Sequence, residues 1–141
     1  MKTAKTAWLA PLLATALSAS GAPPDAPQPR PMRFVGKTVV IRYASGLAVR
    51  ASYPSATELR WEALSGPSAG RRGTERIDAA EVAPDVYFIS WLEAEGTSVS
   101  NVLDLRAMRV TAFVTYDAGN GRRKLFDVGR VEEERPATGR R

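Results

Sequence analysis

The chain has 141 residues, enough for one small domain, and it contains neither histidine nor cysteine. That composition excludes His/Cys metal sites, thiol nucleophiles and Ser-His-Asp catalysis, and the domain has no disulfide to rely on. The net charge of +5 is typical of nucleic-acid binders, but residues 33–134 hold equal numbers of acidic and basic residues. The excess lies at the two ends, so we expect no nucleic-acid partner.

The N-terminus has the pattern of a secretory signal peptide. Lys2 and Lys5 precede an uncharged, largely apolar stretch over 6–20, and the small residues at 18–20 suit cleavage. We expect a signal peptide over 1–20, cleavage within 18–22, and a periplasmic or secreted protein with no membrane contact afterwards. An uncleaved signal that anchors the protein is the alternative.

Two further segments flank the predicted domain. Residues 21–32 are rich in proline and form an extended linker that cannot build a core. Residues 135–141 form a basic tail of Pro, Gly and Arg that we expect to be disordered. The folded domain is therefore predicted over 33–134.

Within the domain, turn residues separate short alternating segments about every 8–12 positions, a spacing typical of all-β folds. The turns include Ala44-Ser45-Gly46, the longer loop 65–70, and the strong hairpin turn 117–121. We expect eight strands and no helix in the domain, the strands lying at 34–43, 47–53, 57–64, 72–82, 86–93, 97–105, 108–116 and 123–131.

Residues 86–105 form the hairpin around which the domain is organised. Tyr87, Ile89, Trp91 and Glu93 fall on one face of its first strand, and the other face is apolar as well. A strand apolar on both faces is usually covered on both sides. Residues 94–96 make the turn, where glycine is free to take a positive φ.

Short connections make neighbours in sequence neighbours in space. An eight-stranded antiparallel meander hides its edges completely by closing into a barrel, whose interior suits side chains or one small ligand. We therefore predict a small closed barrel, with an open sandwich as the alternative. A homodimer is one assembly that such a barrel could form. No calcium loop or phosphate-binding loop is present, so we expect no metal and no cofactor.

Three stretches carry a family resemblance. They are Ser90-Trp91-Leu92-Glu93 followed by Gly96-Thr97; Ser65-Gly66 followed by Ala69-Gly70-Arg71; and Phe34-Val35-Gly36 followed by Tyr43. Together they resemble phenolic acid decarboxylases and, more closely, the MoaF-like domains named after molybdenum cofactor biosynthesis protein F. Both groups are lipocalin-like (calycin) β-barrels, and the resemblance covers roughly 34–131.

The resemblance to the decarboxylases implies a cofactor-free lyase site inside the barrel. Its glutamate, arginine and second tyrosine fall on Glu93, Arg71 and Tyr43, which would be the catalytic residues of an enzyme. Its first tyrosine falls on Ile41, which has no phenol, and the chain lacks the decarboxylases' C-terminal extension. Decarboxylation therefore conflicts with the residues, and the MoaF-like group implies no defined reaction.

A ligand site is the leading hypothesis for function. Tyr43, Trp61, Arg71, Trp91 and Glu93 are predicted to line a pocket for a small apolar or anionic molecule, which the sequence does not identify. A solvated strand end for Glu93, an exposed loop position for Arg71 and simple packing for Tyr43 are the alternatives. Trp61, Trp91, Tyr53 and Tyr87 are candidates for pocket walls, but at least half of them should be core. The second hypothesis is the lyase with Glu93 as acid/base, and the third is an interaction barrel without a ligand.

Overall fold

The structure is a computed structural model that describes residues 30–134. The signal peptide, most of the proline-rich linker and the basic tail lie outside the described residues. This part of the chain holds nine strands: β1 (Thr38–Tyr43), β2 (Ala48–Ser55), β3 (Glu58–Ala63), β4 (Arg72–Arg76), β5 (Asp78–Ala83), β6 (Val86–Leu92), β7 (Ser98–Asp104), β8 (Arg109–Asp117) and β9 (Arg122–Glu133). No helix in the same residues has the length and apolarity needed to cross a membrane.

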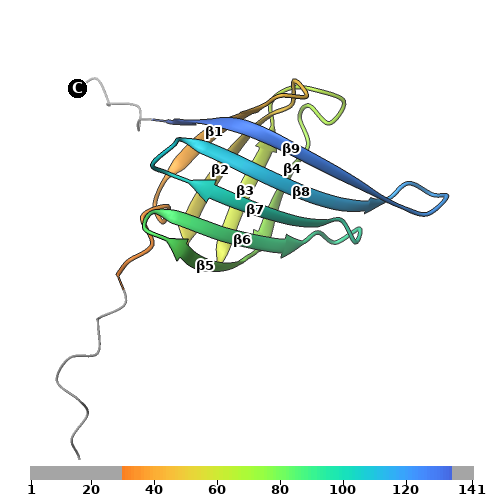
Figure 1. The fold of residues 1–141 in the computed structure, drawn as a ribbon. Coiled ribbons are helices and arrows are strands. Elements are labelled where there is room, and N and C mark those ends of the chain that lie inside the picture. Colours follow the sequence, from red (N-terminus) through yellow and green to blue (C-terminus); the bar gives the residue numbers. More distant parts are fainter. Residues whose placement is uncertain (1–29, 135–141) are drawn as a thin grey trace, which may run out of the picture.

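All nine strands belong to one antiparallel sheet that curls into a nearly closed barrel (Figure 1). The sheet order is β4-β3-β2-β1-β9-β8-β7-β6-β5, so every hairpin pairs neighbours in sequence and the first strand pairs with the last. The predicted all-β antiparallel meander barrel is confirmed. The first–last pairing is what turns a flat meander into a barrel.

The strand expected at 72–82 is divided at Ile77, which explains why nine strands replace eight. β4 pairs with β3 and β5 pairs with β6, and Ile77 alone separates them. Its side chain is fully buried in the core, and its backbone N–H donates to the Thr57 carbonyl at 3.0 Å. The chain therefore bends inward at Ile77. Before the bend it pairs with β3 and after it with β6, so the bend brings the two edges of the sheet, β4 and β5, together.

One end of the barrel is closed by the turn that precedes β1. The strand expected to begin at residue 34 begins at Thr38 instead, because residues 33–36 form a turn with Gly36 at φ 79°. This turn places the fully buried Phe34 ring edge-on against Tyr53 and Tyr87, with ring centroids 5.1 and 5.0 Å apart. Phe34 thus acts as a plug, and we call this end the closed end.

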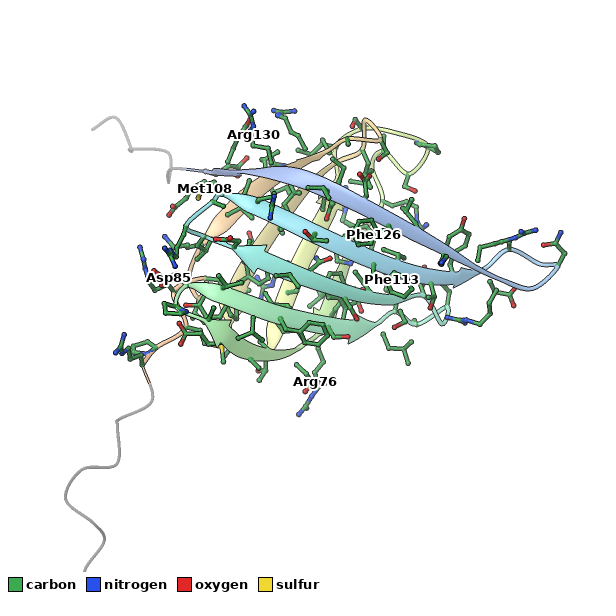
Figure 2. The ribbon with its side chains drawn as sticks, viewed as in Figure 1. Arg76, Asp85, Met108, Phe113, Phe126 and Arg130 are labelled. Carbon is green, nitrogen blue, oxygen red and sulfur yellow. The ribbon has the colours of Figure 1, made fainter. Side chains whose placement is uncertain are left out.

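The outer face of the β6–β9 wall is not covered, contrary to the expectation from its apolar sequence. Phe113 and Phe126 point outward (Figure 2) and are 42% and 67% exposed, and Phe88 on β6 is 41% exposed. Phe113 lies directly opposite Phe126 across the β8–β9 pair. Among the described residues, these aromatic side chains therefore lie exposed on the barrel surface, while the inward residues form the core.

Strand register divides the inward face of this wall into layers. Nearest the closed end are Tyr87, Leu103, Val110 and Gly129. The next layer holds Ile89, Asn101, Ala112 and Asp127, and the layer beyond it holds Trp91, Val99, Val114 and Leu125. Glu93 lies one step further, at the other end, which we call the mouth.

Candidate functional site: a cavity open at the mouth

A cavity of about 670 Å³ occupies the barrel from the mouth down to the layer of Ala112. Its walls come from β1, β2, β3 and β6–β9, with Ser68 and Arg71 added by the loop between β3 and β4. The structure brings all five residues of the predicted pocket to this one cavity: Tyr43, Trp61, Arg71, Trp91 and Glu93. Tyr53 and Tyr87 belong to the buried core, and Tyr53 also borders the cavity.

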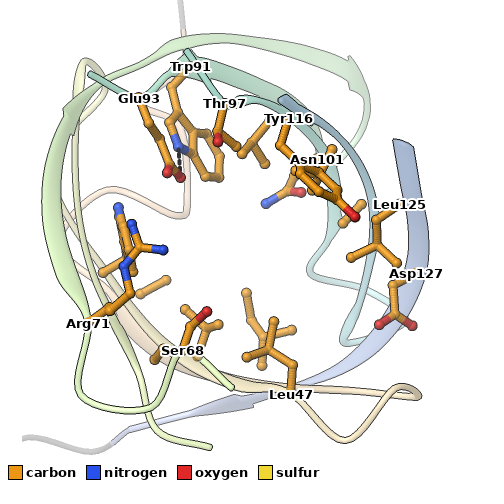
Figure 3. A pocket seen from close by; sticks show the side chains of 18 of the residues that line it. Leu47, Ser68, Arg71, Trp91, Glu93, Thr97, Asn101, Tyr116, Leu125 and Asp127 are labelled. Atoms are coloured by element: carbon orange, nitrogen blue, oxygen red, sulfur yellow. Dashed lines mark hydrogen bonds between the residues drawn. The ribbon is translucent and has the colours of Figure 1, made fainter. Parts of the chain in front are cut away.

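Glu93 and Trp91 lie together at one side of the mouth (Figure 3). They share the inward face of the β6 hairpin, and the Trp91 indole Nε1 donates to Glu93 Oε1 at 3.4 Å. Partial burial, more than any other cause, raises the pKa of Glu93 from 4.5 to about 7. The Trp91 hydrogen bond lowers the Glu93 pKa, but its effect is smaller than that of burial. Glu93 is therefore a half-buried carboxyl that titrates near neutral pH.

Glu95 and Arg71 form an exposed ion pair beside Glu93. Arg71 Nη2 donates to Glu95 Oε1 at 3.0 Å, and the two side chains are 61% and 50% exposed. A hydrogen bond to its own backbone N–H, followed by the Arg71 bond, lowers the pKa of Glu95. The charge of Glu95 and its hydrogen bond to Glu93 in turn help to raise the Glu93 pKa. Of the two carboxyls, Glu93 therefore keeps the proton and Glu95 the charge.

Trp61, on β3, is held in place by two residues of the neighbouring strand β4, a glycine and a glutamate. Its Nε1 donates to Glu75 Oε1 at 3.1 Å. A Cβ built on Gly73, the residue paired with Trp61, would come within 2.7 Å of the indole nitrogen. The indole therefore occupies the space that a side chain at position 73 would need, and the Glu75 hydrogen bond helps to hold this aromatic wall of the cavity in place.

Tyr43 is seated in a similar way. A Cβ on its strand partner Gly129 would lie 3.1 Å from Tyr43 Cδ1 and 2.6 Å from Ile41 Cγ2. Burial, with smaller contributions from Tyr53 and Asp127, raises the Tyr43 pKa well above its usual range. The phenol therefore keeps its proton at neutral pH and offers the cavity a hydrogen-bond donor.

Two polar residues of the cavity were not predicted as site residues. Asn101 and Asp127 are only 4% and 8% exposed, and both lie in the layer below Trp91. In sequence, each occupies an inward position of its alternating strand, between apolar or small residues. They can be recognised as polar residues at inward positions of a strand. That recognition requires knowing which face of each strand points inward.

The cavity presents carboxyl, amide, hydroxyl and aromatic groups. Within residues 30–134, no three His, Cys, Asp or Glu side chains are grouped so that they could hold a metal ion. The charged groups near the mouth are Arg71, Glu93, Glu95 and the rim residue Asp117. The arrangement is therefore suited to binding an organic molecule by apolar contact and hydrogen bonds.

Comparison with known families identifies the domain. The family model described as MoaF-like matches residues 35–124. The chain belongs to the MoaF-like family. The match spans β1 to β8 and ends at the start of β9, so Asp127 in this MoaF-like domain lies beyond the matched residues.

A solved structure shares this barrel. The chain is similar to a "putative beta-lactamase" from Burkholderia vietnamiensis, with 29% sequence identity and a TM-score of 0.67. The similarity covers 74% of this chain and 99% of the other. A comparison with curated proteins found no match. The MoaF-like barrel is thus shared over nearly the whole length of that structure.

Proposed function

We propose that this MoaF-like domain binds a small, partly apolar organic molecule inside the barrel. The observation that carries the proposal is the cavity itself, because about 670 Å³ lies within the range of small-molecule sites. Its walls combine two indoles held in fixed orientations with polar groups at the mouth and deep in the barrel. This combination supports a ligand with an apolar body and one or two polar groups.

The mouth sets a condition on the charge of that ligand. An anionic group that approaches Arg71 competes with Glu95, which already accepts a hydrogen bond from the guanidinium. Glu93 and Asp117 add further acidic groups around the same opening. Recognition of an anion at Arg71 is therefore weak in this arrangement, and the apolar walls supply most of the binding free energy.

Tryptophan fluorescence tests the proposal, since Trp61 and Trp91 both border the cavity. We expect 2-phenylethanol, a neutral aromatic probe, to change the emission in a saturable way. Val114→Phe, which adds a ring at the level of Trp91, should abolish the change while the circular dichroism spectrum stays that of wild type. Flat emission in the wild-type protein would contradict the proposal.

A cofactor-free lyase is the second candidate, and the Glu93 pKa of about 7 favours it. Ile41 lines the cavity where the decarboxylases carry a tyrosine, so one phenol is absent at this position. We expect no release of carbon dioxide from 4-hydroxycinnamic acid. Turnover that disappears in Glu93→Gln would establish the lyase instead.

The name of the Burkholderia protein suggests hydrolysis of a β-lactam, which we do not propose for this domain. A shared barrel does not carry a reaction with it. The cavity is lined by one serine, Ser68, but by no lysine among the described residues that could activate it. Hydrolysis of a chromogenic β-lactam by the purified protein would overturn this view.

Export completes the proposal, and its support is the N-terminal sequence alone. Lys2, Lys5 and the apolar stretch over 6–20 favour a domain that meets its ligand outside the cytoplasm. Mass spectrometry of the protein from its native host should find a chain that begins within residues 19–23. An intact Met1 on a cytoplasmic species would contradict export.

A further inference from the structure

Two side chains that line the deep part of the cavity each hold an oxygen atom that is enclosed by protein and accepts no hydrogen bond from any described residue. These atoms are Oδ1 of Asn101 and Oδ2 of Asp127. The other carboxylate oxygen of Asp127 accepts from the backbone N–H of Val128 at 2.8 Å, which fixes the orientation of the group. Since buried acceptors without a partner are costly, two of them beside one cavity indicate that a donor from outside the chain belongs there.

The two side chains are placed to act on one ligand. Asn101 and Asp127 are both paired with Ala112, one from β7 and the other from β9. Their Cα atoms are therefore about 10 Å apart, two strand spacings, with only a methyl group between them. Figure 3 shows both on the wall across the cavity from Glu93 and Arg71.

The chemistry of the surrounding groups favours a cation over a neutral donor. Asp127 supplies a carboxylate, and no described lysine or arginine borders the cavity except Arg71, whose charge is held at the mouth by Glu95. The indole of Trp91 lies one layer nearer the mouth, within the same wall. An ammonium group gains from a charge-assisted hydrogen bond and from a neighbouring aromatic ring.

We propose that the layer of Asn101, Ala112 and Asp127 is a subsite for the ammonium group of a small amine, whose apolar body lies along the cavity toward the mouth. Asp127 Oδ2 and Asn101 Oδ1 accept its hydrogen bonds. This inference rests on the proposed function and refines it, because it assigns a cationic group to the partly apolar ligand. Asp127 lies beyond the residues that the family model matches.

Calorimetric titration with three probes of one shape separates the possibilities. The probes are 2-phenylethylamine, 2-phenylethanol and 3-phenylpropanoate, which present a cation, a neutral hydroxyl and an anion on the same ring. We expect the amine to bind at least about tenfold more tightly than the alcohol, and the carboxylate to bind most weakly. This ranking in the wild-type protein requires no variant.

Two matched variants assign the preference to the subsite. Asp127→Asn keeps the shape and should weaken amine binding by about tenfold or more, while alcohol binding stays within about twofold. Asp117→Asn removes the same charge from the rim and should leave the ranking unchanged. Asn101→Leu should weaken both the amine and the alcohol by about two- to tenfold.

Each outcome decides one claim. Equal binding of the amine and the alcohol, or tightest binding of the carboxylate, overturns the ammonium subsite and leaves the small-molecule barrel standing. A loss in Asp117→Asn as large as that in Asp127→Asn also overturns it, since the preference would then be a general effect of negative charge. Absence of binding by all three probes overturns the proposed function itself.

Discussion

The two ends of the barrel follow the same alternation of inward and outward residues, yet one end is filled and the other is hollow. At the closed end, Phe34 packs edge-on against Tyr53 and Tyr87, and all three rings are buried. Toward the mouth, the inward positions hold small or thin side chains such as Ala63, Ala112 and Val114. The difference teaches that side-chain volume, and not the strand pattern, decides where such a barrel has a cavity.

The chemistry of the two ends differs as well. The closed end uses the Tyr87 hydroxyl to accept a hydrogen bond from the backbone N–H of Arg33 at 3.0 Å. The cavity instead contains the unpartnered oxygens of Asn101 and Asp127 and, at its mouth, a carboxyl with a raised pKa. The packed aromatic core therefore lies at one end and the cavity with its unpartnered polar groups at the other, and the following variants test that division.

The largest expected effect is at the closed end. Phe34→Ala removes a fully buried ring and should lower the free energy of unfolding by about 3–5 kcal/mol, measured by urea denaturation. Trp91→Ala, at the hollow end, should have a smaller effect because its ring borders the cavity. Equal losses from the two variants would remove the contrast between the ends.

A smaller loss of stability is expected where a glycine makes room for a cavity wall. Gly129→Ala would place a Cβ 2.6 Å from Ile41 Cγ2, so neighbouring side chains must shift. We expect the free energy of unfolding to fall by about 1–3 kcal/mol. Gly119→Ala serves as a contrast, because that turn glycine has open space around it and is limited by its φ of 82° alone. An unchanged unfolding midpoint in Gly129→Ala would show that Tyr43 is not packed against Gly129.

The pH dependence of the mouth gives a third, smaller effect. Because the Glu93 pKa rises from 4.5 to about 7 on folding, the folded protein binds an extra proton between these values. The contribution of Glu93 to stability is thus fullest below about pH 4.5 and is lost as the pH rises to 7. Glu93→Gln should therefore be more stable than wild type at pH 8 but not at pH 4, by about 1 kcal/mol or less after solvent screening.

The Trp91 emission reports the same titration, since its indole donates to Glu93. The wild-type emission should change with a midpoint near pH 7, and Glu93→Gln should remove the change. Glu95→Gln tests the interaction between Glu93 and Glu95. It removes a neighbouring negative charge and should lower the pH midpoint of the Trp91 emission change. A midpoint near pH 4.5 in the wild type would place Glu93 in bulk-like solvent.

The smallest effect is expected from the exposed ion pair. Arg71→Ala removes a positive charge that is 61% exposed, so the overall stability should change little. The midpoint of the Trp91 titration should rise by about 0.2–0.5 in pH because both carboxyls lose a cation. A rise of more than about one would mean that Arg71 acts on Glu93 directly.

The sequence is sufficient to predict the barrel and one side of its cavity. Alternation places Tyr87, Ile89, Trp91 and Glu93 on one face, and the structure turns that face inward. Trp61 and Trp91, which lie on two strands that are not neighbours in the sheet, both border the cavity. Local pattern is enough here because each feature depends on period-two alternation within one strand.

Other features depend on contacts between distant strands. Ile77 lies in a weakly patterned segment, and only the pairing of β4 with β3 and β5 with β6 shows that the chain bends there. Asn101 and Asp127 become neighbours through Ala112, which no single segment reveals. Register between strands is set by the whole sheet, so these juxtapositions could not be predicted from local sequence.

Methyl chemical shifts measured by NMR during titration with 2-phenylethanol test the central contrast most directly. We expect the methyl signals of Val99, Ala112 and Val114, which border the cavity, to move with the probe concentration. Those of Val39, Val110 and Val131, which are buried at the closed end, should stay in place. Shifts confined to outward residues such as Val102 and Val128, with the cavity methyls unmoved, would contradict a hollow, ligand-binding end.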